Sequence, residues 1–228
     1  MFKKIVLNIP HSSPDGADFV PYSDNEALRQ LVNHWTDWFT DELFAPDAAL
    51  APYVAVNKFH FSRFLVDVER LVDDPLEKVG QGILYTNYEY LTREINERDR
   101  RLLTALYHQY ISSFKLEPDT ILVDCHSFPS EMAPDIDICT GYNNDYSYPG
   151  EAVIAKIEST FANAGYRVGI NTPYSNALTP SPGTHYKSVM IEVNKAAYMD
   201  ETAIMPIPDK FKAVRTCILS VYQNLLGK

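Results

Sequence analysis

The stretch Leu122-Val123-Asp124-Cys125-His126-Ser127-Phe128 decides the fold that we expect. The β-branched and apolar residues 120–123 stop abruptly at polar groups, as a buried parallel strand does at its carboxyl end. In open α/β sheets, ligands bind just beyond that end. Asp124 and His126 are two residues apart, so their side chains share one face of an extended chain. A carboxylate in this position orients a metal-binding histidine, and a strand-end histidine capped by chance is the alternative.

Composition indicates an ordinary globular protein. The 228 residues predict one domain, residues 1–228, with a sizeable core. A formal charge of −10 argues against nucleic acid and against an anionic membrane surface as partners. Three scattered cysteines form neither a disulfide framework nor a thiolate zinc cluster. No segment is long and apolar enough for a signal peptide or a membrane span, so we expect a cytoplasmic protein. The sequence gives no oligomeric state.

Strands alternate with helices along the chain. We expect strands at residues 4–9, 53–56, 64–68, 121–123, 136–139, 167–170 and 188–193. We expect helices that open at residues 23–26 and at Thr36-Asp37, and longer helices over residues 89–114, 151–164 and 209–226. This alternation is typical of an α/β sandwich with a largely parallel sheet.

Polar groups gather at the ends of the predicted strands. His11 follows the first strand as His126 follows its own, and Glu192 lies inside an apolar strand. A buried charge without partners costs several kcal/mol, so such a residue has a partner or a task. In the predicted strand at residues 64–68, alternation places Asp67 and Glu69 on the opposite face from Arg70. For each residue taken alone, a salt bridge at a strand end is the alternative interpretation. The number of polar strand ends in one chain favours a functional site.

Three other enzyme classes do not fit. On an extended chain Cys125 points away from Asp124 and His126, which argues against a thiol nucleophile. Neither Ser12 nor Ser127 has the context of a nucleophile elbow, and residues 80–82 lack the third glycine of a dinucleotide-binding loop.

Several motifs together resemble the N-formylglutamate amidohydrolase family. The resemblance covers nearly the whole chain, and its order and spacing are more specific than any one piece. It implies a zinc-carboxypeptidase-like fold, a three-layer α/β/α sandwich with a largely parallel, mixed sheet. It also implies metal-assisted hydrolysis of an amide on an acidic amino acid. The motifs are Ile9-Pro10-His11-Ser12, Thr36-Asp37-Trp38, residues 61–70, residues 80–85, Asp124-Cys125-His126-Ser127, Ile191-Glu192-Val193-Asn194-Lys195 and residues 198–201.

The resemblance also implies roles for individual residues. His11 and His126 match the metal-binding histidines, and Glu192 matches the general base. For the third ligand, related zinc carboxypeptidases have a glutamate three residues after the first histidine, where this chain has a proline. Asp37 is therefore our first choice for that ligand, and Asp15 is the second.

The substrate-binding residues form a second group. Arg70 matches the position that holds the substrate carboxylate, and a guanidinium offers a carboxylate a planar, bidentate fit. Arg63 either assists or pairs with Asp67, and we favour pairing. His185 precedes the strand of Glu192 and is a candidate pocket residue. Glu69 stands where many family members have asparagine, which leaves the substrate's identity open more than the chemistry.

The chemistry of these residues is coherent. Two imidazoles and one carboxylate leave a fourth position on Zn²⁺ for water, as in catalytic zinc sites. We therefore expect a zinc-dependent amidohydrolase acting on a small acidic substrate, N-formyl-L-glutamate by resemblance. A related zinc deacylase, a small carboxypeptidase and a non-catalytic ligand-binding relative are the alternatives.

Overall fold

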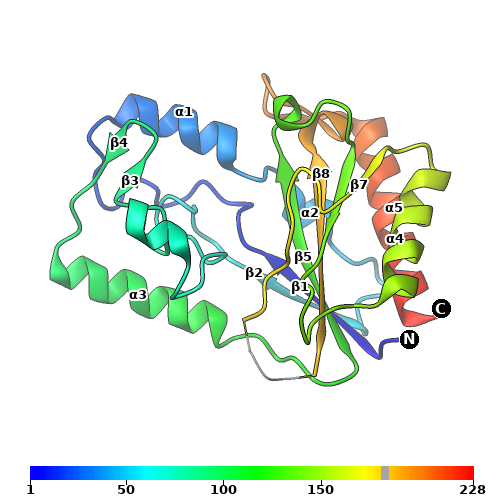
Figure 1. Ribbon diagram of the computed structural model, residues 1–228. Coiled ribbons are helices and arrows are strands. Elements are labelled where there is room, and N and C mark those ends of the chain that lie inside the picture. The colour runs from blue at the N-terminus through cyan, green and yellow to red at the C-terminus, as the bar shows by residue number, and fades with distance from the viewer. Residues whose placement is uncertain (181–184) are drawn as a thin grey trace. The chain divides into compact units, whose positions relative to one another are not determined.

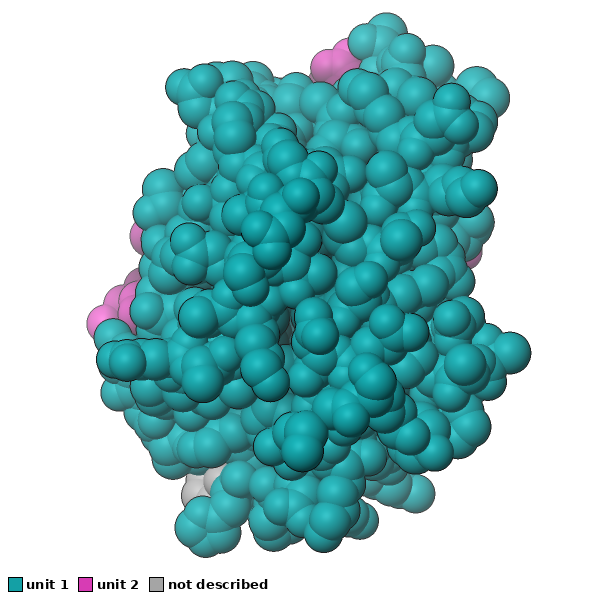
Figure 2. All heavy atoms as spheres, turned by 90° about the vertical axis from the view of Figure 1, so that its right-hand side faces the viewer, with its two compact units in different colours: residues 1–9, 39–58, 115–228 teal, residues 10–38, 59–114 magenta. Residues whose placement is uncertain are grey.

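The computed structural model describes residues 1–180 and 185–228. The chain forms two compact units, which Figure 2 colours separately. Unit 1 comprises residues 1–9, 39–58 and 115–228, and unit 2 comprises residues 10–38 and 59–114. The single domain over residues 1–228 stays a prediction. Within the described ranges, the helices are too short or too polar to cross a membrane.

A six-stranded sheet forms the centre of unit 1, with strand order β2-β1-β5-β8-β6-β7 (Figure 1). Neighbouring strands are parallel except β6 and β8, which are antiparallel. The predicted α/β class with a largely parallel, mixed sheet is therefore confirmed. The bounds are β1 Lys4–Ile9, β2 Val54–Lys58, β5 Thr120–Phe128, β6 Ile138–Gly141, β7 Val168–Ile170 and β8 Lys187–Asn194.

Helices α4 (Glu151–Asn163) and α5 (Pro208–Leu226) pack against each other along the sheet of unit 1 (Figure 1). Helix α5 buries one apolar face, and the hydroxyl of its Tyr222 donates to the carbonyl oxygen of Phe44 at 3.0 Å. The smaller elements of the unit are α2 (Thr40–Leu43), the hairpin β9 (Met199–Asp200) and β10 (Met205–Pro206), and the 3₁₀ helices η2 (Ser130–Met132) and η3 (Lys195–Ala197).

Unit 2 has its own apolar core. Helix α1 (Asn25–Trp35) buries Leu28, Leu31 and Val32 against Phe64 and Tyr85. The unit also contains the hairpin β3 (Asn87–Tyr88) and β4 (Leu91–Thr92), the 3₁₀ helix η1 (Pro75–Val79) and helix α3 (Glu97–Ile111). This apolar core holds in place the segments that carry the polar residues of unit 2.

Two predicted helices begin later than expected. Thr36 caps the end of α1, and Phe39 adopts a left-handed conformation with φ 65°, so the next helix starts only at Thr40. The helix predicted over residues 89–114 starts at Glu97, because Glu89 has φ 52° within the hairpin β3–β4. The Asn96 side chain then caps α3 by accepting from the backbone of Asp99.

The predicted strand at residues 64–68 is wrong. The backbone N–H of Leu65 donates to the carbonyl oxygen of Ser62 at 2.9 Å, which closes a turn, and that of Asp67 donates to Ile83 at 2.9 Å. The apolar residues of this segment are buried in a turn, so their pattern reports burial and not extended structure. Strand β5, by contrast, is longer than predicted and continues through Phe128.

Substitution of Asp24 tests whether the cap at the predicted start of α1 stabilises unit 2. Its carboxylate accepts from the backbone N–H groups of Glu26 at 2.9 Å and Ala27 at 3.0 Å. We expect Asp24→Ala to lower the free energy of unfolding by about 1 kcal/mol, because two helix N–H groups lose their acceptor. Asp24→Ser retains an acceptor and should stay near the wild type in urea unfolding. Equal losses in both variants would contradict the capping role.

Candidate functional site

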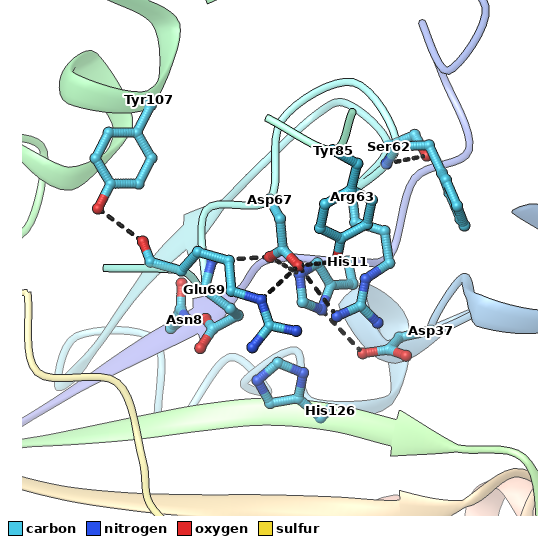
Figure 3. Close-up of polar contacts among 12 residues, drawn as sticks. Asn8, His11, Asp37, Ser62, Arg63, Asp67, Glu69, Tyr85, Tyr107 and His126 are labelled. Carbon is cyan, nitrogen blue, oxygen red and sulfur yellow. Dashed lines mark hydrogen bonds and ion pairs between the residues drawn. The ribbon is translucent and has the colours of Figure 1, made fainter. Parts of the chain in front are cut away.

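A buried carboxylate, Asp67, is the centre of the polar contacts in unit 2 (Figure 3). Its Oδ1 accepts from His11 Nε2 at 2.9 Å and from the backbone N–H of Glu69 at 3.0 Å. Its Oδ2 accepts from the hydroxyl of Tyr85. The turn at residues 62–67 therefore places one carboxylate where several donors converge.

Two arginines flank the same carboxylate. Arg63 Nη2 lies 3.4 Å from Asp67 Oδ2, and Arg70 Nε lies 3.6 Å from it. Burial alone raises the pKa of Asp67, but the charges of Arg63, His11 and Arg70 hold that pKa well below its ordinary value. Asp67 is thus ionised and can only accept hydrogen bonds, which assigns the donor role to His11 Nε2.

His11 and Asp37 are neighbours in unit 2. The backbone N–H of Asp37 donates to the carbonyl oxygen of His11 at 2.9 Å, and His11 Nδ1 lies 3.8 Å from Asp37 Oδ2. Burial and the charge of Arg63 lower the pKa of His11 to about 4, although Asp67 and Asp37 act in the opposite direction. The imidazole is therefore neutral at pH 7, with its proton on Nε2 and its lone pair on Nδ1.

His126 has the same kind of support within unit 1. Its Nε2 lies 3.0 Å from Oδ1 of Asp124, two residues earlier on β5. Asp124 also accepts from the side-chain amide of Asn8 at 2.7 Å and from the backbone N–H of Leu178 at 2.9 Å. Burial raises the pKa of Asp124, but His126 and these hydrogen bonds lower it overall. The predicted pairing of Asp124 with His126 is present, and a neutral ring that donates from Nε2 has its lone pair on Nδ1.

Glu192 lies beside His126 in the sheet. The two residues are register partners on the parallel strands β5 and β8, so their side chains project from the same face. Glu192 is buried, as is its register partner Cys139 on β6. Burial raises the pKa of the Cys139 thiol to about 11, and the charge of Glu192 adds to that effect. The Glu192 carboxylate and the His126 imidazole are thus neighbours on one face of the sheet.

The remaining predicted residues have mixed outcomes. The pairing of Arg63 with Asp67 is confirmed. The predicted separation of Arg70 from Asp67 on opposite faces is wrong, because the segment is a turn and brings the two side chains together. His185 is exposed, and its role in a pocket stays a prediction. Asp15 is also exposed, whereas Asp37 is buried, which favours Asp37 over Asp15 as a ligand.

Sequence reasoning missed the partners of Asp67. It paired Asp67 with Arg63 but did not connect it to His11 or to Tyr85, which is 18 residues away. A buried tyrosine requires a hydrogen-bond partner, so Tyr85 in its apolar context was the available signal.

The donor set suits zinc. His11 and Asp37 in unit 2 and His126 in unit 1 offer two imidazole nitrogens and a carboxylate oxygen as metal-binding groups. Two ligands of one zinc ion lie at most about 4.3 Å apart, and the 3.8 Å between His11 Nδ1 and Asp37 Oδ2 is within that limit. That separation is too long for a hydrogen bond. Each histidine presents Nδ1 and donates its other nitrogen to a carboxylate, as zinc-binding histidines do.

One family model matches this chain, and two solved structures share its fold. A family model described as N-formylglutamate amidohydrolase matches residues 3–199. A search of curated proteins gave no match. The N-formylglutamate amidohydrolase from Ralstonia eutropha has a similar structure, with a TM-score of 0.67, 16% identity, and coverage of 98% of this chain and 94% of its own. A gene product of Agrobacterium tumefaciens has a TM-score of 0.64, 16% identity, and coverage of 99% and 91%.

The lowered pKa of His11 predicts a pH-dependent stability of the metal-free protein. The unfolded state binds a proton near pH 6.5 and the folded state only near pH 4, so stability falls as the pH decreases through this window. Between about pH 7.5 and about pH 4.5, His11 should account for a loss of about 2–3 kcal/mol in urea unfolding. His11→Gln removes this part of the loss, whereas the exposed His60→Gln should retain it. Parallel pH profiles for wild type and His11→Gln would contradict the assignment.

Proposed function

Because this chain belongs to the N-formylglutamate amidohydrolase family, we propose that it is a zinc-dependent hydrolase of N-acylated acidic amino acids. The substrate that we propose is N-formyl-L-glutamate, cleaved to formate and glutamate. One observation carries the proposal: His11 and His126 each pair their Nε2 with a buried carboxylate, as histidines that bind a catalytic metal do.

The proposed ligands are His11 and Asp37 from unit 2 and His126 from unit 1. His11 is the second residue after β1, and β1 is the hydrogen-bonded neighbour of β5, which carries His126. This connection along the chain supports a shared ion. When bound, zinc supplies Lewis-acid polarisation of an amide carbonyl and makes water a stronger acid.

Glu192 is the proposed general base. Its carboxylate takes a proton from the attacking water and returns it to the departing amide nitrogen, so the proton is conserved through the reaction. Burial supports this role, because it limits the access of bulk water to the carboxylate. The position of Glu192 beside His126 on adjacent strands also supports it.

Arg70 is the proposed reader of the substrate's carboxylate. Arg63 and Arg70 both flank Asp67, and Arg70 also lies 3.8 Å from a carboxylate oxygen of Asp74. A guanidinium offers a carboxylate a planar, bidentate fit, which agrees with the proposed acidic amino acid. Asp67 thus helps to order both guanidinium groups.

Metal content tests the ligand set. We expect His126→Ala to lose stoichiometric zinc, because two remaining ligands do not hold the ion, while the exposed His60→Ala retains it. Asp37→Asn should weaken zinc binding more than Asp15→Asn. The measurement is zinc per chain by elemental analysis, on protein purified without chelator or added metal. Full occupancy in His126→Ala would refute the ligand set, and the reverse order of the aspartates would exchange Asp37 for Asp15.

Substrate specificity tests the reaction. We expect formate release from N-formyl-L-glutamate at a higher kcat/KM than acid release from N-acetyl-L-glutamate, and poor turnover of N-formylglutamate α-amide. Glu192→Gln should keep zinc and lose about 10² or more in kcat, whereas Glu158→Gln on the surface of α4 should be unchanged. Preference for another acyl group would indicate a related deacylase. Binding of these compounds without any hydrolysis would indicate a ligand-binding protein.

A further inference from the structure

Arg93 is a buried arginine directly after β4, held by backbone carbonyl groups. Its Nε donates to the carbonyl oxygen of Tyr85, and its Nη2 donates to that of Leu65 at 3.1 Å. Its guanidinium carbon lies 4.7 Å from the ring centroid of Tyr22, within the range of a cation–π contact. Three different segments of unit 2 thus meet at one side chain.

Burial of the Arg93 guanidinium has a cost in free energy. Within the described residues, the guanidinium of Arg93 forms no ion pair with a carboxylate, and its Nη1 has no hydrogen-bond partner. Burial lowers the pKa of Arg93, which reflects the cost of removing the charge from water. An apolar residue of similar length would fill the space without that cost, so the hydrogen bonds that Arg93 makes are its specific contribution.

The two carbonyl groups belong to the segments that define the surroundings of Asp67. Leu65 is two residues before Asp67 in the turn, and the Tyr85 hydroxyl donates to Asp67 Oδ2. The backbone N–H of Asp67 donates to Ile83, two residues before Tyr85. Arg93 therefore connects two segments of the chain. One carries Asp67, and the other carries Tyr85, whose hydroxyl donates to Asp67.

We propose that Arg93 is a positioning residue, which holds the Leu65 and Tyr85 segments together so that Asp67 accepts a hydrogen bond from His11 Nε2–H. Arg93 contacts neither His11 nor the proposed zinc, and it acts through Asp67. The expected effect on the tautomer of His11 depends only on contacts within unit 2. The effect on zinc affinity rests in addition on the proposed function.

The first test reads the imidazole of His11 in zinc-free protein at about pH 7.5, where the ring is neutral. Two-bond ¹H–¹⁵N correlation spectra distinguish the two tautomers, and the loss of a signal in His11→Gln gives the assignment. We expect the wild type to carry the proton on Nε2, and Arg93→Met to show a mixture with Nδ1–H. Arg98→Met, which removes an exposed guanidinium on α3, should leave the wild-type tautomer.

The second test is zinc affinity, measured by competition with a chromophoric chelator. A lost supporting contact of this kind weakens metal binding by about 10- to 100-fold, so we expect that change in Arg93→Met and none in Arg98→Met. If Arg93→Met melts earlier but keeps both the wild-type tautomer and the wild-type zinc affinity, Arg93 has only a structural role and the proposal is overturned.

If Arg93→Met does not fold, Arg93→Lys replaces it in the tautomer measurement. Lysine keeps the charge but lacks the planar fork that reaches two carbonyl groups, so we expect a smaller shift of the tautomer in the same direction. An unchanged tautomer in Arg93→Lys would then overturn the proposal. Failure of the wild type to bind zinc would refute the proposed function, while the tautomer measurement would still decide the role of Arg93.

Discussion

A buried carboxylate that accepts a hydrogen bond from a histidine ring is the interaction on which the polar structure of this protein depends. It occurs twice, once in each unit: Asp67 with His11, and Asp124 with His126. In both pairs the carboxylate is ionised despite its burial, because further donors surround it. The cost of the buried charge is thus offset locally, and the result is a ring with a fixed tautomer.

The two pairs reach this state by different routes. Asp124 and His126 lie on a single strand, where the two-residue repeat places them on one face, and Asn8 supports them from the neighbouring strand. His11 and Asp67 are 56 residues apart and meet only because a turn and a set of carbonyl groups hold Asp67 in place. Regular structure positions the first pair, whereas irregular backbone positions the second.

The charges around Asp67 connect the support of His11 to the arginine that we propose to bind the substrate's carboxylate. The same carboxylate that orients His11 also lies between Arg63 and Arg70. A change at Asp67 therefore affects His11 and the arginines together. Glu69 joins the same network through its backbone N–H. Its side chain is thus not required for the hydrogen bond that its backbone makes to Asp67.

The sequence by itself determined the α/β class, most strands of unit 1, the start of α1 and the pairing of Asp124 with His126. Each of these depends on short-range periodicity or on a cap within a few residues. Only the tertiary structure decided the surroundings of Asp67, because the apolar residues at 64–68 look like a strand and are in fact a buried turn. Burial in a core and burial in a strand produce the same local pattern. The partners Tyr85 and Arg93 reach Asp67 and its turn through contacts that no local pattern encodes.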